Sequence, residues 1–160
     1  MVLRNQVEWA LHCCSILAGM PPEAFIPTKD LAGFHGVPKE YLSKALQALA
    51  QAGIVEATLG PTGGYRLARS AAKISFLDIV EAVEGIQRTF SCTEIRGNNP
   101  CKPKGRKESG LCSIAKAMYR ADEAWRDSLR SVTLESLSRE LENVIEPEQA
   151  RKNLAWFLER

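Results

Sequence analysis

The first segment of the chain carries apolar residues at three- and four-residue spacing. The pattern begins near Asn5 and stops before Gly19, which Pro21 and Pro22 follow. This spacing places the apolar side chains on one face of an α-helix, and glycine followed by proline is typical of a helix end. The sequence therefore predicts an amphipathic helix from Asn5 to Ala18. Its apolar positions are Val7, Ala10, Leu11, Cys14, Leu17 and Ala18.

Two shorter helical patterns follow, and a glycine separates them. Thr28 is the expected N-cap of the first, which Gly36 closes. Pro38 opens the second, which ends at Gly53. Two helices joined by a tight glycine turn predict a helix-turn-helix, although a corner of a helical bundle would give the same pattern. The apolar stripe of the second helix consists of Leu42, Ala45, Leu46 and Leu49.

Two β-rich runs, IVEATLG and GYRLAR, come next and flank a turn-forming cluster that contains Pro61 and Gly63. This arrangement predicts a β-hairpin. With the two helices before it, the hairpin predicts a winged helix-turn-helix, so the expected fold class is mainly α with a small β-hairpin wing. Downstream, SFLDIVEAVEG predicts a helix, a long helical stretch runs from about Ser113 to Val132, and Thr133 is the expected cap of a last helix.

The composition is that of an ordinary soluble globular protein, with 160 residues of which 45% are hydrophobic and 25% charged. The five cysteines are an odd number, and the opening residues carry neither a long apolar run nor a cleavage site. We therefore expect a cytoplasmic protein with reduced thiols and no membrane segment. The net charge of +2 is too small to indicate nucleic-acid binding by itself. No nucleophile–base set and no nucleotide-binding loop can be named, which argues against an enzyme.

Positive charge gathers between Ile26 and Lys73, around the predicted helix-turn-helix and wing. Six Lys and Arg residues stand there against three acidic residues, whereas the chain beyond Thr133 is rich in glutamate. Such a basic face favours contacts with DNA phosphates. We expect the second helix of the pair to enter a major groove and the hairpin to reach the neighbouring minor groove. The candidate DNA contacts are Lys39, Tyr41, Ser43, Lys44, Gln47, Gly63, Gly64 and Arg66.

A loop rich in Gly, Asn, Pro and Lys carries Cys92, Cys101 and Cys112. Thiolates in this setting suit a soft metal centre, because the neighbouring cations offset the charge of an anionic cluster and favour deprotonated sulfur. A disordered basic loop with incidental thiols is the alternative. Cys13 and Cys14 are adjacent and must point to different faces of the first helix, so we expect both to be packing residues. The loop cations are Arg96, Lys102, Lys104, Arg106 and Lys107.

The run YLSKALQALAQAGIVEATLGPTGGYRLAR, then ISFLDIVEAVEG, the three-cysteine loop and SVTLESL together resemble the Rrf2 family of transcription regulators over nearly the whole chain. The resemblance implies a homodimer with a winged helix-turn-helix in each subunit and with the long helix after the loop as the interface. It also implies, in many members, an iron–sulfur cluster that controls operator binding. On this basis residues 1–86 are the DNA-binding domain, residues 87–112 the cluster-binding loop, and residues 113–160 the dimerisation and C-terminal helices.

The spacing of the loop cysteines departs from the family pattern, because eight and ten residues separate them, more than in typical members. Three cysteines therefore need not be three ligands. In nitric-oxide-sensing relatives a carboxylate on the first helix ligates the cluster of the partner subunit, and Glu8 falls in the matching place. His12 lies four residues further along and shares its face. The candidate metal ligands are Glu8, His12, Cys92, Cys101 and Cys112.

Five candidates compete for what are ordinarily four places, so one loop cysteine is expected to be spare. Two cysteines on one iron, with nitrogen or oxygen ligands on the other, is a workable arrangement for a [2Fe–2S] cluster, as Rieske centres show. We therefore favour [2Fe–2S] over [4Fe–4S], in keeping with an overall pattern that looks closest to the redox-sensing member RsrR. Trp9, beside Glu8, is the residue expected to move when the cluster changes its redox state; the alternative is that it simply fills the subunit interface.

The combined expectation is an iron–sulfur-dependent, redox-sensing repressor that binds operator DNA as a homodimer, with the cluster at the subunit interface. A cluster-free or zinc-binding regulator of the same family is the alternative, although the sequence has no Cys-x-x-Cys pair of the kind common in zinc sites. An electron carrier would leave the winged helix unexplained.

Overall fold

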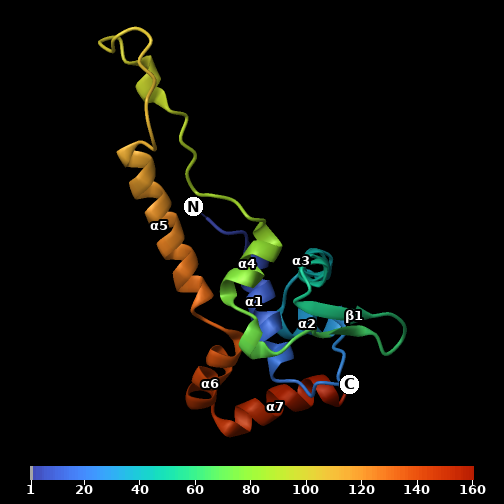
Figure 1. Cartoon of the computed structure of the whole chain (residues 1–160). Helices are drawn as coiled ribbons and strands as arrows, with labels where there is room; N and C mark the ends of the chain where they lie inside the picture. The colour runs from blue at the N-terminus through green and yellow to red at the C-terminus, as the bar shows by residue number, and fades with distance from the viewer. Residues whose placement is uncertain (1) are drawn as a thin grey trace.

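Helix α1 (Asn5–Ala18) lies at the centre of the computed structural model, which describes residues 2–160 (Figure 1). Its bounds are those that the apolar spacing predicts. One face is buried, and this face brings α1 against elements from both halves of the chain. The neighbours of α1 are α3 (Lys39–Gln51), α4 (Phe76–Glu84), α6 (Leu134–Val144) and the strand β2 (Gly64–Leu67).

The predicted helix-turn-helix is confirmed, with α2 (Thr28–His35) packed against α3. Gly36 ends α2 in the left-handed region, with φ of 64°, where a side chain would be strained. The predicted N-cap is wrong: Pro27 holds that position, and Thr28 is the first helical residue, without a side-chain cap. Proline fits there because its fixed φ suits the extended backbone that precedes a helix.

The predicted wing is an antiparallel hairpin of β1 (Val55–Thr58) and β2, in which Val55 pairs with Leu67 and Thr58 with Gly64. A further bridge joins Tyr65 of β2 to Ile26, just before α2. A Cβ on Gly64 would lie 2.3 Å from the carbonyl group of Ile26. Glycine is therefore needed at this position so that the wing can approach the chain's own backbone and sit beside the helix pair.

Two capping boxes fix the elements that follow the wing. After a short 3₁₀ turn, η1 (Ala71–Lys73), Ser75 and Asp78 cap α4 reciprocally. Thr133 and Ser136 do the same for α6, as predicted for Thr133. Ser75 and Thr133 also form an isolated bridge, which places the starts of α4 and α6 side by side.

The chain beyond Thr133 folds into two helices, where a single last helix was expected. After α6 the backbone turns out of helical geometry at Ile145, and α7 (Pro147–Leu158) begins with proline at its first position. The ring of Phe34 on α2 lies 4.8 Å from Phe157 and 5.2 Å from Trp156 on α7, centroid to centroid. Both C-terminal helices therefore pack back on the N-terminal part, α6 against α1 and α7 against α2.

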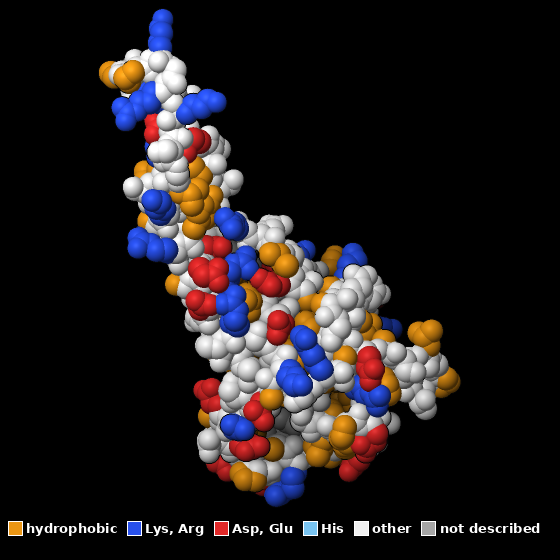
Figure 2. All heavy atoms as spheres, viewed as in Figure 1, with side chains coloured by type: hydrophobic (Ala, Val, Ile, Leu, Met, Phe, Trp, Pro, Cys, Tyr) orange, Lys and Arg blue, Asp and Glu red, His pale blue; other side chains and the backbone are white. Residues whose placement is uncertain are grey.

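A projecting arm is formed by residues 86–112, which include a 3₁₀ turn, η2 (Ile95–Asn98), and by the start of α5 (Ser113–Arg130) (Figure 1). Lys and Arg side chains lie at the end of this arm (Figure 2). The C-terminal part of α5 packs on α4. Ile114 and Met118, on the arm side of α5, are 68% and 39% exposed. None of the helices within residues 2–160 combines the length and apolar character needed to cross a membrane.

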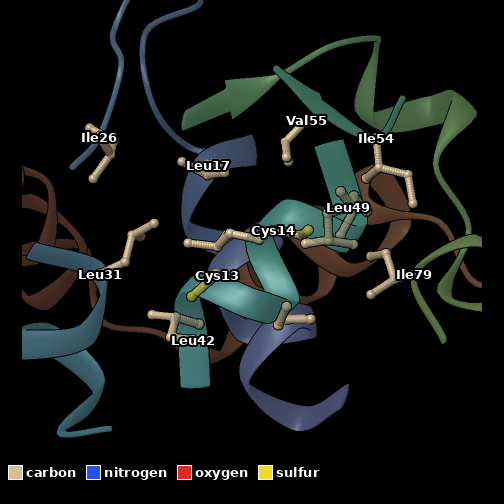
Figure 3. Packing of buried hydrophobic residues seen from close by; sticks show 14 of the residues in the cluster. Cys13, Cys14, Leu17, Ile26, Leu31, Leu42, Leu49, Ile54, Val55 and Ile79 are labelled. Atoms are coloured by element: carbon tan, nitrogen blue, oxygen red, sulfur yellow. The ribbon is translucent and has the colours of Figure 1, made fainter. Parts of the chain in front are cut away.

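The main core lies between α1, the helix pair and the wing (Figure 3). Leu31, Leu42 and Leu49 are fully buried there, and so are the side chains of Cys13 and Cys14. The prediction that these two cysteines pack in the interior is confirmed. Adjacent residues on a helix point about 100° apart, and both are covered because α1 is enclosed on more than one side.

Candidate functional site

A groove of about 460 Å³ separates α3 from the wing. Several of the predicted DNA contacts line it together, which brings the first turns of α3 and the hairpin turn to one surface. The residues that come from this prediction are Lys39, Ser43, Gln47, Gly63 and Gly64. Amides and hydroxyls here are suited to hydrogen bonding, and the lysines provide positive charge for phosphates.

Tyr41 and Lys44 are exposed on α3 but do not line this groove. Tyr41 is 54% exposed, and the ammonium of Lys44 lies 5.8 Å from the centre of its ring. These two predicted DNA contacts therefore do not share the groove with Lys39, Ser43 and Gln47.

Arg66 does not line the groove. Its guanidinium donates to the carboxylate of Glu56 and to the carbonyl of Pro22, and it stacks 4.4 Å from the ring of Phe25. These contacts hold the wing against the loop before α2. Glycine at position 63 is likewise explained by the turn itself, since a Cβ there would lie 2.4 Å from the carbonyl oxygen of Thr58.

The groove also contains residues from the start of α2 that the sequence-based list of contacts left out. Thr28 and Lys29 line the groove from the first turn of α2. Free backbone N–H groups at a helix N-terminus, together with a nearby lysine, favour an anion. The sequence did contain a sign of this possible anion site, namely a predicted helix start at Thr28 followed by Lys29. The direction in which α2 points, however, depends on how it packs against α3.

The exposed face of α1 borders a second hollow, of about 730 Å³. Glu8 and His12 both line it, one helical turn apart, as their spacing predicts. Both side chains are exposed. The rest of the wall is mainly apolar and comes from α1, α2, α4 and α6, including Leu11, Phe34, Phe76, Leu137 and Leu141.

Two side chains next to Glu8 and His12 reach other parts of the fold: Trp9 packs on the core, and His35 belongs to α2. Trp9 is partly buried and packs against the main core. The ring of His35, the last residue of α2, lies 5.6 Å from the ring of His12. Burial, with a smaller contribution from His12, lowers the pKa of His35 below its ordinary value. One candidate ligand thus contacts the helix-turn-helix directly.

The arm carries the other candidates, with Cys92 and Cys112 half-buried and Cys101 exposed. All three thiols are free. Cys112 occupies the N-cap position of α5, and the backbone N–H of Cys101 donates to the side chain of Asn99. Within residues 2–160, no three His, Cys, Asp or Glu side chains are gathered closely enough to hold a metal ion. The five candidate ligands are therefore not assembled within one subunit.

Two of the arm cations are already paired with glutamates of the same loop. Arg96 donates to Glu94 and to the carbonyl of Gly110, and Lys102 lies 3.0 Å from Glu108. The pKa of Arg96 is raised, mainly by its hydrogen bond to Glu94, with smaller contributions from Glu108 and Cys112. Arg96 thus braces the two sides of the arm and lies near Cys112.

Several known proteins are similar to this chain. A family model described as Rrf2, iron-dependent transcriptional regulator, matches residues 3–140. Protein rrf2 of Nitratidesulfovibrio vulgaris is 34% identical over 122 residues, which are 72% of this chain and 72% of that protein. The HTH-type transcriptional regulator NsrR of Geobacillus kaustophilus is 28% identical over 137 residues, 86% of this chain and 89% of that protein.

Solved structures share the fold. IscR of T. potens superposes with a TM-score of 0.68 at 19% identity, covering 91% of this chain and 92% of that one. CymR, the global cysteine regulator of B. subtilis, superposes with a TM-score of 0.66 at 23% identity, covering 88% and 98%. The match to CymR covers nearly all of that protein.

The two groups of cysteines should differ sharply in reactivity. Burial raises the pKa of Cys13 to about 12, and burial followed by the neighbouring Cys13 raises the pKa of Cys14 as well. Both thiols therefore stay protonated and enclosed at pH 7 to 8. In reduced, metal-free protein we expect an aromatic disulfide reagent to label three of the five thiols rapidly and the other two only after denaturation.

Two substitutions act as matched controls for this experiment. Cys101→Ser should lower the number of rapidly labelled thiols by one, whereas Cys13→Ala should leave it unchanged. Rapid labelling of Cys13 or Cys14 in the folded protein would contradict the burial described here.

Proposed function

The chain belongs to the Rrf2 family of transcriptional regulators, and we propose that it is an iron–sulfur-dependent, redox-sensing repressor that binds operator DNA as a homodimer. The observation that carries this proposal is the division of the donor set. A carboxylate and an imidazole stand one turn apart on an exposed face of α1, and the thiols stand on an arm that projects away from the same subunit.

DNA binding is assigned to α3 and the wing. The groove between them combines lysines with amide and hydroxyl groups, which together can contact phosphates and base edges. Two such surfaces in a dimer would meet two half-sites of a pseudo-palindromic operator. Lys39 and Lys44 are proposed as direct contacts, while the pairing of Arg66 with Glu56 supports a role in holding the wing.

The donor set suits an iron–sulfur cluster. Thiolate, imidazole and carboxylate are all ligands that iron accepts, and a mixed set of this kind is compatible with [2Fe–2S]. A bound cluster would supply a one-electron couple, and with it a change of charge at the site. Glu8 and His12 would hold one side from α1, and two of Cys92, Cys101 and Cys112 would hold the other from the arm.

The apolar surfaces around these residues support a cluster shared between two subunits. The hollow beside Glu8 and His12 has a largely apolar wall, and α5 exposes Ile114 and Met118 next to the arm. Exposed apolar surface of this kind is typical of an interface. We propose that the arm and α5 of one copy cover the α1 face of the other.

Trp9 is proposed to pass the state of the site to the DNA-binding elements. It is adjacent to Glu8, yet its ring packs against the core that α1 shares with α3. A change of charge at Glu8 and His12 would favour a different position for this large side chain. Movement of α1 against α3 would then alter the spacing of the two reading helices.

The first test concerns the DNA surface. Lys44→Ala and Lys39→Ala should each weaken operator binding and lower the slope of log affinity against log salt by about one unit, because each removes one counterion-releasing contact. The matched control is Lys152→Ala, which removes an exposed lysine of α7 that pairs with Glu148. Fluorescence anisotropy across a salt series gives the slopes. Unchanged slopes in both Lys39→Ala and Lys44→Ala would remove α3 from the interface.

The second test asks whether the ligands come from two subunits. One chain carries Glu8→Ala and His12→Ala, and a second, differently tagged chain carries Cys92→Ala and Cys112→Ala. Neither homodimer should hold iron, whereas the purified heterodimer should regain about one [2Fe–2S] cluster, because one of its two sites is intact. Iron and acid-labile sulfide are measured for each species. A heterodimer without iron, beside a loaded wild type, would contradict ligation across the interface, and a wild type that holds zinc would contradict the cluster itself.

The third test concerns Trp9. Trp9→Ala should keep the visible spectrum of the cluster and make operator affinity nearly equal for oxidised and reduced protein, since the moving side chain is gone. Trp9→Phe, which retains an aromatic ring, should keep part of the difference. Anisotropy of the two redox states under anaerobic conditions measures it. Loss of dimer or cluster, with normal switching of the remaining loaded protein, would show that Trp9 only fills space.

A further inference from the structure

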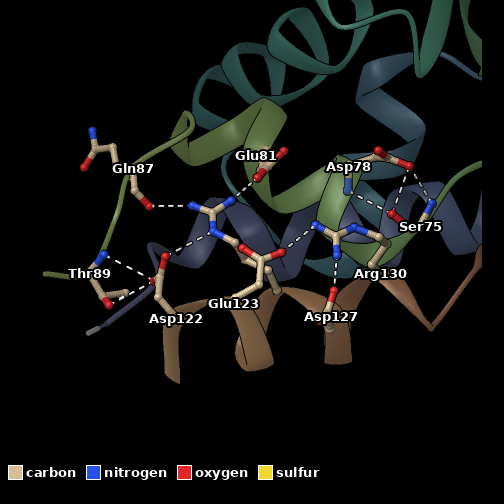
Figure 4. A network of polar contacts seen from close by, with 10 residues as sticks. Ser75, Asp78, Glu81, Gln87, Thr89, Asp122, Glu123, Asp127 and Arg130 are labelled. Atoms are coloured by element: carbon tan, nitrogen blue, oxygen red, sulfur yellow. Dashed lines mark hydrogen bonds and ion pairs between the residues drawn. The ribbon is translucent and has the colours of Figure 1, made fainter. Parts of the chain in front are cut away.

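A buried polar network stands where the arm leaves the folded body (Figure 4). The chain ends α4 at Glu84, turns at Gly85 and passes along α5 before it reaches Cys92. Arg126 and Asp122 of α5 face this passing segment, and they are only 9% and 7% exposed. Two charged side chains so deeply buried at the base of a projecting loop call for an explanation.

Both side chains form hydrogen bonds with α4 or with the segment that leaves it. The guanidinium of Arg126 donates to Glu81 of α4, to Asp122 at 3.2 Å and to the main-chain carbonyl of Gln87 at 2.8 Å. The carboxylate of Asp122 accepts from Thr89, at 2.9 Å from its hydroxyl and at 3.3 Å from its backbone nitrogen. The pKa of Asp122 is lowered, first by the hydroxyl of Thr89 and also by Arg126.

The choice of partners shows what the network does. Burying an ion pair costs desolvation, and apolar side chains of similar volume could join α4 to α5 at least as well. Apolar side chains could not hold the main chain of residues 87 and 89 at fixed positions. The hydrogen bonds to the Gln87 carbonyl and the Thr89 N–H fix the register of this segment against α5, that is, which of its residues lies beside which residue of the helix.

That register bears directly on the thiols. Cys92 follows Thr89 by three residues, and Cys112 is the N-cap of α5, the same helix that carries Asp122 and Arg126. Tyr119 extends the contact toward the arm, since its ring lies 5.9 Å from Phe90 and 4.8 Å from the guanidinium of Arg88. The position of Cys92 relative to Cys112 therefore depends on the hydrogen bonds that hold Gln87 and Thr89 against α5.

We propose that Asp122 and Arg126 are positioning residues of the ligand arm, which hold the segment from Gln87 to Thr89 against α5 and so fix Cys92 relative to Cys112. The inference rests on the proposed function, in which these thiols bind a cluster. A metal site needs its ligands held to within about half an ångström, by side chains that are themselves fixed. An arm without this anchor would present its thiols over a range of separations.

The test uses three substitutions. Arg126→Met keeps an unbranched apolar stem and removes every donor, and Thr89→Val removes a single hydroxyl at nearly constant volume. Arg130→Met is the matched control, because Arg130 lies one turn further along α5 and pairs with Asp127 and Glu123 at an exposed position. All three are compared in the dimer with Cys101→Ser as the common background.

The first measurement needs no cluster. Nitroxide labels on Cys92 and Cys112 of metal-free protein, diluted with unlabelled chains, give a distance distribution by pulsed electron resonance. We expect a narrow distribution in the background protein and in Arg130→Met, and a broadened or shifted one in Thr89→Val and Arg126→Met. An unchanged distribution in both of these variants would overturn the proposal.

The second measurement uses loaded protein without the Cys101 substitution. Loss of a group that hydrogen-bonds directly to a ligand costs a metal site about tenfold or more in affinity, and Arg126 acts one step further out, so cluster retention against a chelator should fall by up to about tenfold in Arg126→Met. Its reduction potential should shift as well, and Arg126→Lys should recover part of both changes. A lower melting temperature with unaltered potential and retention would show a merely structural role. A wild type without iron would refute the proposed function, while the distances in metal-free protein would still test the anchor.

Discussion

Helix α1 presents a buried face and an exposed face that do different things, and the rest of the structure depends on this constraint. Its buried face, with Ala10, Cys13 and Cys14, fills the core beneath α3. Its exposed face carries Glu8 and His12 beside a largely apolar hollow. Because a helix is rigid at this length, a displacement caused on one face is felt on the other. A single short helix can therefore connect a candidate metal site to a DNA-reading helix without a separate transmitting domain.

The arm is the complementary part of this design. It places thiols away from the body of its own subunit and apart from Glu8 and His12, which is why the site proposed above is built from two copies of the chain. A projecting loop has few packing contacts to fix it. The ion pairs of Arg96 and Lys102 within the arm and the buried contacts of Asp122 and Arg126 at its base compensate for that lack. Polar contacts here supply definite geometry where apolar packing is scarce.

The C-terminal helix α7 covers the side of α2 that carries Phe34. It lies beyond residue 140, where the match to the family model ends. Trp156 and Phe157 contact Phe34, which contacts His35, and the ring of His35 lies beside that of His12. The last turn of α2 is thus enclosed between the candidate ligand helix and α7. This enclosure gives α2 a more defined position than packing against α3 alone.

The sequence by itself determined the local elements, because their signals are short in range. Apolar spacing gave α1 and α3, Gly36 gave the turn between α2 and α3, and the capping residue Thr133 gave the start of α6. The burial of Cys13 and Cys14 also followed from their place on an apolar helix. The spacing of Glu8 and His12 placed them on one face before any tertiary contact was known.

Only the tertiary structure decided how distant segments meet. It turned Arg66 toward Glu56 and Pro22, added Thr28 and Lys29 to the groove, and packed α7 against α2. It also buried Asp122 and Arg126, which in sequence look like ordinary charges of an amphipathic helix. Periodicity reports which face of a helix is apolar, but it holds no information on which polar side chain will find a main-chain partner far away in the sequence. Such pairs form only after the helices have packed, since packing sets the distances at which hydrogen bonds can compensate for lost hydration.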